Sequence, residues 1–153
     1  MKYDSRTDTL LHIKRVQELM IWFANYLLNA TLQHDLSKLE EPEKSTFDKI
    51  TPLLKTTTYG SDEYKKIMAD NRVNIDHHQK SNSHHPEFYS NGIEGMSLMD
   101  IVEMFLDWKA ASERRSDGDI FKSIKIQEKR FGIDKQLIKI FQNTAEYFGS
   151  KSN

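Results

Sequence analysis

Apolar residues recur every three to four positions along most of the chain, which is the period of an amphipathic helix. The pattern predicts a first helix over residues 8–30 and a second over residues 42–54. Pro42 occupies a first-turn position that tolerates proline, whereas Pro52 is expected to end or bend the second helix. The apolar positions of the first helix are Leu11, Ile13, Val16, Leu19, Met20, Phe23, Tyr26 and Leu27. The residues expected to face inward from the second helix are Phe47, Ile50, Leu53 and Leu54.

A turn at residues 59–61 separates the second helix from a third, which is expected to start at Ser61 and to reach about residue 79. Asp62 and Glu63 suit the first turn of that helix, since acidic side chains are favoured near a helix N-terminus. One substantial loop is then predicted over residues 81–95. Its turn-forming residues are Pro86, Asn91, Gly92 and Gly95.

The last third of the chain predicts three more helices. Ser97 and Asp100 have the spacing of a capping box, which favours a helix running to about Arg114. Two further helices are expected over residues 119–131 and 134–148. No segment shows strand-like alternation over more than four residues, so the predicted fold class is all-α.

Length and composition narrow the picture further. The 153 residues fit one compact helical bundle of six to seven helices over residues 1–153, with its core within residues 8–148. Lys+Arg is 22 and Asp+Glu is 23, and this balance argues against a general nucleic-acid-binding protein. The absence of cysteine excludes disulfides, thiolate metal sites and cysteine nucleophiles. No apolar run approaches the roughly 20 residues of a membrane span, and no signal peptide is visible, so we expect a soluble, cytoplasmic protein without a membrane partner.

The histidines are concentrated in the first 85 residues, and four of them fall within residues 77–85. The six are His12, His34, His77, His78, His84 and His85. Histidine is the commonest side-chain metal ligand near neutral pH, so this crowding suggests a metal site. Each histidine taken singly also has a structural interpretation. His12 lies on an apolar helix face and could be a core residue, and His34 with Asp35 could be a helix cap followed by surface. The two later pairs could be a polar helix end and loop.

The helix predicted after the long loop carries carboxylates, which are a second type of candidate metal ligand. Asp100, Glu103 and Asp107 form an acidic stripe whose default place is a solvated face. Asp107, however, lies between Leu106 and Trp108, which suits a carboxylate near the interior. A buried carboxylate needs a partner, and a metal ion would be one. Imidazoles and carboxylates together suit a divalent transition metal or a magnesium-like ion.

The order of these residues resembles the HD superfamily of metal-dependent phosphohydrolases. That order is a histidine on a first helix, a His-Asp pair, later histidines and an aspartate on a later helix. The segment His34-Asp35-Leu36-Ser37-Lys38 resembles the His-Asp-Ile-Gly-Lys signature of that superfamily, with serine in place of glycine. Residues 101–107 resemble the helix that carries the terminal aspartate, which favours Asp107 over Asp100 as the ligand.

The chain also resembles a poorly characterised HD-like family of phages and bacteria, over roughly residues 10–145. The segments that carry this resemblance are Thr58-Tyr59-Gly60-Ser61-Asp62-Glu63-Tyr64, His84-His85-Pro86-Glu87 and Asp107-Trp108-Lys109-Ala110-Ala111. The resemblance implies an HD-domain-like helical fold and metal-dependent phosphate chemistry.

The resemblance also implies a ligand set. A first metal ion would be held by His12, His34, Asp35 and Asp107. Asp35 could bridge to a second ion bound by His77 or His78 and by His84 or His85. The ion could be Mn, Fe, Co, Zn, Ni or Mg, and either one or two ions could bind. A divalent ion lowers the pKa of bound water toward roughly 7, which makes hydroxide available for hydrolysis.

Contacts to the phosphate would come from cations near the metal. Lys38 is the first candidate, because it matches the signature lysine and is expected to share a helical face with His34. Glu87 or an unused histidine could act as general acid. Side chains that could stack on a nucleobase, or equally serve as core or loop anchors, are Tyr59, Phe88, Tyr89 and Trp108.

We therefore expect an enzyme that hydrolyses a phosphate ester or anhydride of a nucleoside mono- or triphosphate. Two alternatives remain open: a phosphodiesterase acting on a cyclic or dinucleotide signal, and a non-catalytic metal- or nucleotide-binding or helical interaction protein. A homodimer is possible, since the last helix is rich in apolar residues. We expect that helix mainly to close the core of its own chain.

Overall fold

A computed structural model describes residues 3–114 and 118–149 of the protein. Within these residues the chain forms seven α-helices and three short 3₁₀ helices, and no strand, which confirms the predicted all-α class. The chain divides into two units, residues 1–34 and 35–153.

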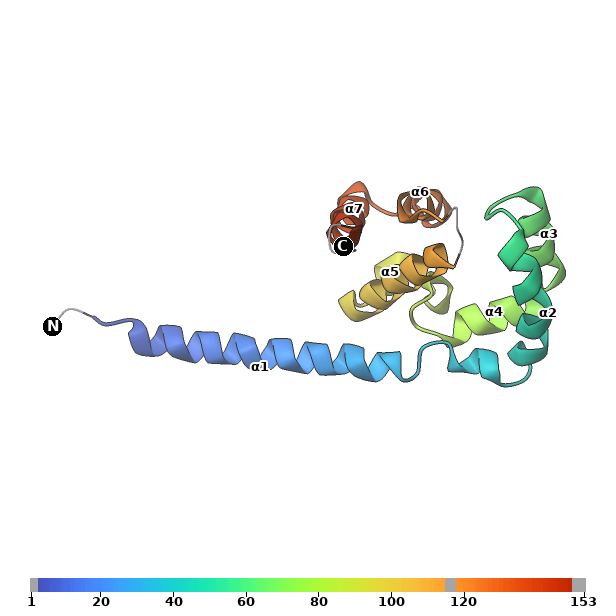
Figure 1. The fold of residues 1–153 in the computed structure, drawn as a ribbon. Coiled ribbons are helices and arrows are strands. Elements are labelled where there is room, and N and C mark those ends of the chain that lie inside the picture. Colours follow the sequence, from blue (N-terminus) through green and yellow to red (C-terminus); the bar gives the residue numbers. More distant parts are fainter. Residues whose placement is uncertain (1–2, 115–117, 150–153) are drawn as a thin grey trace. The chain divides into compact units, whose positions relative to one another are not determined.

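The described part of the first unit is dominated by one long helix, α1 (Arg6–Thr31), drawn in blue in Figure 1. It confirms the helix predicted over residues 8–30. The backbone N–H of Leu32 donates to the carbonyls of Ala30 and Asn29 and so satisfies orphan acceptors at the helix end. His12 lies in the second turn of α1, and His34 follows the helix as the last residue of this unit.

The second unit begins with the 3₁₀ helix η1 (Leu36–Leu39) and continues through α2 (Glu43–Thr56). Pro52 lies inside α2, so the expectation that it ends the helix is wrong. The helix continues for one more turn, and the Thr57 hydroxyl then donates to the Leu53 carbonyl at 2.8 Å, which satisfies one of its last acceptors. Ile50 is fully buried, whereas Leu53 lies at the margin of the buried stripe and is exposed, contrary to prediction.

The single helix predicted over residues 61–79 is in fact two helices. These are α3 (Asp62–Asp70) and α4 (Arg72–Ser81), which meet at Asn71. The side-chain amide of Asn71 donates to the Ile67 carbonyl at 2.8 Å. Asparagine breaks helices in this way, because its side chain competes with the backbone for hydrogen bonds. The turn before α3 forms as expected: Gly60 has a φ of 78°, and the Ser61 hydroxyl accepts from the Tyr64 N–H.

The loop predicted over residues 81–95 contains two 3₁₀ turns, η2 (Pro86–Phe88) and η3 (Gly92–Gly95). The capping box then forms as predicted at the start of α5 (Leu98–Glu113), where the Ser97 hydroxyl accepts from the Asp100 N–H at 3.2 Å. Two further helices follow, α6 (Ile120–Phe131) and α7 (Lys135–Gly149).

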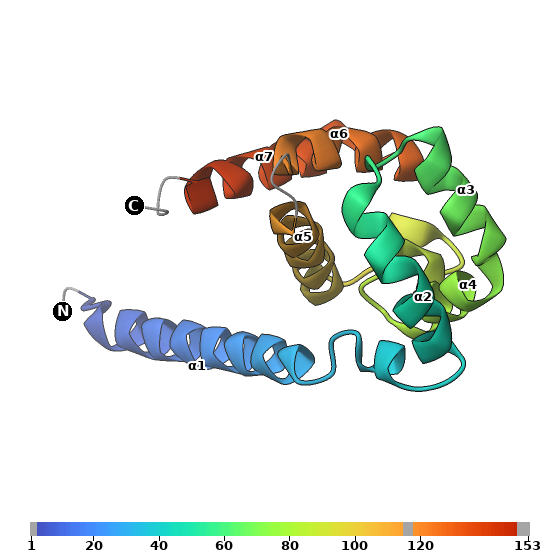
Figure 2. The ribbon, with the colours of Figure 1, turned by 45° about the vertical axis from the view of Figure 1, so that its right-hand side comes forward.

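Helices α5, α6 and α7 share the main hydrophobic core, and Figure 2 shows them as a group beside α2, α3 and α4. Phe105 and Phe141 stack within this core with ring centroids 5.3 Å apart. The buried core residues are Met104, Phe105, Trp108, Ile120, Ile124, Ile133, Ile138, Phe141 and Ala145. The prediction that α7 closes the core is confirmed by Ile138 and Phe141, although Ile140 on the same helix is exposed. None of the helices described is long and apolar enough to cross a membrane.

Candidate metal centre

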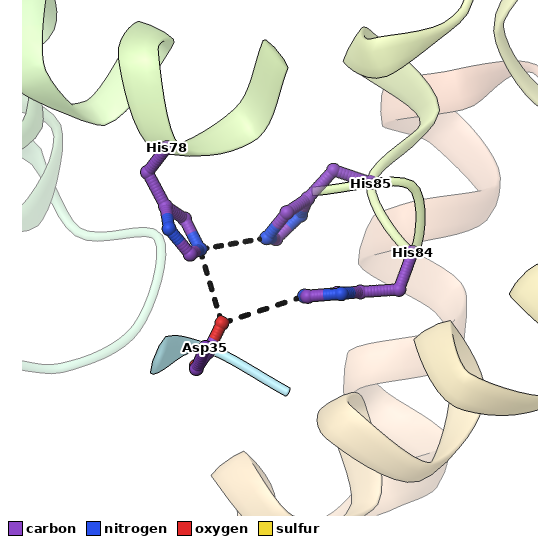
Figure 3. Close-up of side chains that lie close together, drawn as sticks. All are labelled: Asp35, His78, His84 and His85. Atoms are coloured by element: carbon purple, nitrogen blue, oxygen red, sulfur yellow. Dashed lines mark hydrogen bonds and ion pairs between the residues drawn. The ribbon is translucent and has the colours of Figure 1, made fainter. Parts of the chain in front are cut away.

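Three imidazoles and one carboxylate of the second unit converge beside α4 (Figure 3). Asp35 precedes η1, His78 lies in the last turns of α4, and His84 and His85 belong to the loop that follows α4. One potential ligand atom from each of the four side chains lies within 4.8 Å of the other three. Residues separated by up to 50 positions are thus brought together at one place.

The backbone of Asp35 has an unusual conformation. Asp35 has a φ of 60°, which makes it the one non-glycine residue in the left-handed region among the residues described. Aspartate tolerates that region better than most residues, but the conformation remains strained, and such strain is typical of functional positions. α1 ends at Thr31 and no helix joins His34 to Lys38, so the expected shared helical face is wrong. Lys38 instead reaches back from η1 to pair with the Asp35 carboxylate.

The hydrogen-bond partners of His78 assign its tautomer. Its Nδ1 atom lies 2.9 Å from Oε2 of Glu43, a carboxylate that can only accept, so Nδ1 carries the proton. The Nε2 atom lies 3.2 Å from Oδ1 of Asp35, so it donates a proton to that carboxylate when no cation is bound and offers a lone pair when a cation takes the proton's place. Nε2 of His85 is 3.0 Å from the same nitrogen. A lone pair that faces a carboxylate oxygen is stabilised by a cation between them.

His84 has the same arrangement as His78. Its Nδ1 atom lies 3.2 Å from Oε1 of Glu103, on α5, and its Nε2 atom lies 3.5 Å from Oδ1 of Asp35. Each of the two buried histidines thus has one nitrogen on a carboxylate and the other directed at Asp35. This carboxylate–histidine pairing is the usual support of a histidine metal ligand.

The protonation states fit a cation site. Burial raises the pKa of Asp35, but hydrogen bonds from His78 and His84 and the charge of Lys38 outweigh it, so the pKa of this carboxyl lies well below its usual range. Burial and the neighbouring His84 and His78 lower the pKa of His85 to about 3. Asp35 is therefore ionised and His85 neutral near pH 7, which are the forms that bind metal ions.

A second carboxylate lies beside Asp35. One oxygen of Asp107, on α5, lies within 4.8 Å of an oxygen of Asp35. Two ionised carboxylates at this separation repel each other unless a positive charge lies near both. The buried His/Asp groups of this unit could therefore hold a metal ion, and Asp107 is brought to the same place, as the sequence predicted.

The matched family model covers residues 1–147 of the chain. The chain belongs to the DUF5662 family. The description of DUF5662 is a family of unknown function, so membership alone assigns no activity. No curated protein and no solved structure matches the chain.

The structure separates the two histidines of the first pair in this DUF5662 chain. His78 joins the cluster, whereas Nδ1 of His77 lies 2.8 Å from Oε1 of Glu43 and the His77 side chain is half exposed. Both histidines of the second pair, His84 and His85, join the cluster. His12 and His34 belong to the first unit, so their place in the ligand set stays a prediction.

Of the other two predicted catalytic residues, the structure places only Lys38 at the cluster. Lys38 lies at the cluster through its ion pair with Asp35. Glu87 lies in η2 and forms an ion pair of 2.6 Å with Arg130 of α6. This ion pair engages the Glu87 carboxylate outside the cluster of Asp35, His78, His84 and His85. Its role as general acid is untested and is not supported by this contact.

Two residues of the site were missed by the sequence analysis. Glu43 is the first residue of α2 and has no exposed surface, and its carboxylate accepts from His77, His78 and the Ser37 hydroxyl. Glu103 was assigned to a solvated stripe but contacts His84. A buried glutamate looks like any surface glutamate in a sequence, so only its position four residues before Asp107 could have indicated Glu103.

Proposed function

We propose that Asp35, His78, His84 and His85 bind a divalent metal ion and that the protein is a metal-dependent phosphohydrolase acting on a nucleotide. The observation that carries the proposal is the convergence of the Nε2 atoms of His78 and His84 on one oxygen of Asp35. A partly buried carboxylate faced by two imidazole nitrogens favours positive charge beside it, and a metal ion could supply that charge together with the Lys38 ammonium group.

The donor set favours a first-row transition ion. Three imidazole nitrogens suit Zn²⁺, Fe²⁺, Ni²⁺ or Co²⁺, whereas Mg²⁺ prefers a shell made of oxygen. Asp107 supplies a further oxygen close to Asp35. A mixed nitrogen–oxygen shell also accepts Mn²⁺. Of the six candidate ions, Mg²⁺ therefore fits this donor set least well.

A bound divalent ion supplies two things to a hydrolase: it acidifies water, and it neutralises charge on a phosphoryl oxygen. The chain itself supplies the rest. Glu43 and Glu103 hold the rings of His78 and His84 in the orientation that directs Nε2 inward. Asp107 lies close enough to Asp35 to accept a proton from a water molecule held at the cluster, or to serve as a further ligand.

Lys38 is the proposed contact for the phosphate. Its ammonium group pairs with Asp35, and it lies 5.0 Å from the centre of the Phe47 ring, which limits where it can go. A cation bound by the cluster would share the charge of Asp35 and so weaken its pairing with Lys38. Lys38 can then donate to an anionic oxygen of the substrate without leaving the site. The choice of a phosphorylated nucleotide as substrate rests on the resemblance to HD phosphohydrolases and on this lysine.

The test is a screen for phosphate release. Full-length protein is freed of metal with a chelator, reloaded separately with Mn²⁺, Fe²⁺, Co²⁺, Ni²⁺, Zn²⁺ or Mg²⁺, and assayed on nucleoside mono- and triphosphates and on cyclic dinucleotides. We expect activity with at least one transition ion, and its loss in Asp35→Ala. The control is Asp70→Ala, which changes an exposed aspartate at the end of α3.

Two results would contradict the proposal. Equal activity in Asp35→Ala would remove the cluster from the reaction. Stoichiometric metal without phosphate release from any of these nucleotides would favour the non-catalytic, metal-binding alternative.

A further inference from the structure

A cavity of about 230 Å³ lies between α5 and α6, and its wall contains two aromatic side chains, Tyr59 and Trp108. Ile126 adds an apolar side chain to the same wall. Cavities that enclose whole drug-sized ligands start at about 300 Å³. This one is therefore large enough for a ring system but not for a whole nucleotide.

The cavity contains a polar group that lacks a partner. Gln127 lines it and is only 6% exposed. The side-chain nitrogen of Gln127 donates to the Tyr59 hydroxyl at 3.1 Å, but its carbonyl oxygen Oε1 has no hydrogen-bond partner among the residues described. A buried carbonyl without a partner is unfavourable, and a ligand that donates an N–H to it would remove that cost.

Helix α5 links the cavity to the candidate metal centre. Trp108 follows Asp107 on α5, and Asp107 lies within 4.8 Å of Asp35. The charge of Asp107 is also among the influences on the hydroxyl of Tyr59, another lining residue, whose pKa is raised chiefly by burial. One helix thus contributes a residue to the metal cluster and the next residue to the cavity.

From these observations we infer that the cavity is the site of a nucleobase, held between Tyr59 and Trp108 with an N–H group donated to Oε1 of Gln127. Aromatic side chains pack well against the flat ring of a base, and each base carries an N–H or amino donor. The sugar and phosphate would remain outside this small cavity, on the side of Asp107. The inference rests on the proposed function, because that function supplies the nucleotide to which the base belongs.

The experiment measures nucleoside binding, which requires neither hydrolysis nor metal. Adenosine, guanosine, cytidine and uridine are titrated into the full-length protein by calorimetry, with ribose 5-phosphate as a ligand that lacks a base. Ala111→Phe fills the cavity from an exposed position on its wall. Ala110→Phe is the matched control, because Ala110 is also exposed on α5 but does not line the cavity. We expect saturable nucleoside binding that Ala111→Phe weakens about tenfold or more and Ala110→Phe leaves within about twofold.

A second comparison tests the hydrogen bond to Gln127. Purine riboside lacks the exocyclic amine of adenosine, and inosine lacks that of guanosine. We expect the aminated member of at least one pair to bind about tenfold more tightly, and Gln127→Met to abolish that difference while the protein keeps its thermal stability.

The outcomes separate this inference from the proposed function. If no nucleoside binds, or if the two phenylalanine variants behave alike, the inference is overturned, even where metal-dependent phosphate release is observed. If nucleosides bind as expected but no phosphate is released, the base site stands and the proposed hydrolase activity fails.

Discussion

Oε2 of Glu43 lies 2.9 Å from Nδ1 of His78, and the glutamate side chain has no exposed surface. The contact fixes the ring of His78 so that its other nitrogen faces Asp35 at 3.2 Å. Burial raises the pKa of Glu43, but hydrogen bonds from His77, Ser37 and His78 outweigh it and keep the carboxyl ionised. Glu43 therefore acts on the candidate metal centre through His78.

The first prediction concerns this support. Glu43→Gln keeps the size of the side chain but removes the charge that holds the Nδ1 proton of His78. Loss of such a supporting carboxylate lowers metal affinity about 10–100-fold. The measurement is a competition titration with a metal-binding dye, with circular dichroism as the check on folding. Glu41→Gln, at an exposed glutamate outside the cluster, is the control. Unchanged affinity in Glu43→Gln would show that the contact does not support a ligand.

The second prediction separates two adjacent histidines. His78 is buried and faces Asp35, whereas the His77 side chain is 49% exposed and contacts Glu43, which supports His78. We expect His78→Ala to lose about a hundredfold or more in metal affinity and His77→Ala to stay within about tenfold of the wild type. Bound metal per chain after gel filtration measures both. The account would fail if His77→Ala lost the metal and His78→Ala kept it.

The helical periodicity predicted most of the fold, because amphipathic spacing and capping residues act locally. Helices α1, α5, α6 and α7 lie within a few residues of their predicted bounds, and the capping box at Ser97 forms. The break at Asn71 was missed, since it depends on one side chain competing with the backbone. Local sequence does not show which of the two interactions prevails.

Only part of the candidate site could be predicted, because its geometry also depends on contacts between residues distant in the sequence. Residue types and their order pointed to Asp35, the later histidines and Asp107, and the structure brings together Asp35, Asp107 and three of the four later histidines within the second unit. Helical periodicity could not show which of His77 and His78 joins the cluster. Adjacent side chains on a helix point in different directions, and the packing of neighbouring elements decides which of them faces the cluster. Glu43 was invisible for the same reason: its burial depends on histidines more than 30 residues away.

The third prediction concerns alkaline pH and a group away from the cluster. Burial raises the pKa of Tyr64 to about 12, with a further contribution from the neighbouring Tyr59. Between pH 10 and 12 the unfolded chain loses this proton and the folded chain keeps it, so the free energy of unfolding falls as pH rises. At pH 11 the expected loss is ~1 kcal/mol relative to pH 9. Urea unfolding at the two pH values measures it, and Tyr64→Phe should reduce the loss by about that amount. An identical pH dependence in Tyr64→Phe would contradict the burial of this phenol.

The fourth prediction tests the core with two isoleucines of α7. Ile138 is 6% exposed and belongs to the core, whereas Ile140 is 58% exposed. Replacement of Ile138 by alanine leaves a cavity and should lower the free energy of unfolding by about 2–5 kcal/mol. The same replacement at Ile140 should cost less than about 1 kcal/mol. Urea denaturation of the two variants compares them directly, and equal losses would mean that α7 does not present this face to the core.

The most direct measurement of the central claim is X-ray absorption at the K-edge of zinc bound to the full-length protein. The account predicts about one ion per chain, a first shell of nitrogen and oxygen, and the outer-shell scattering of about three imidazole rings, reduced by one ring in His84→Ala. A shell made only of oxygen without imidazole scattering, or a spectrum that His84→Ala leaves unchanged, would contradict a metal centre built from Asp35, His78, His84 and His85.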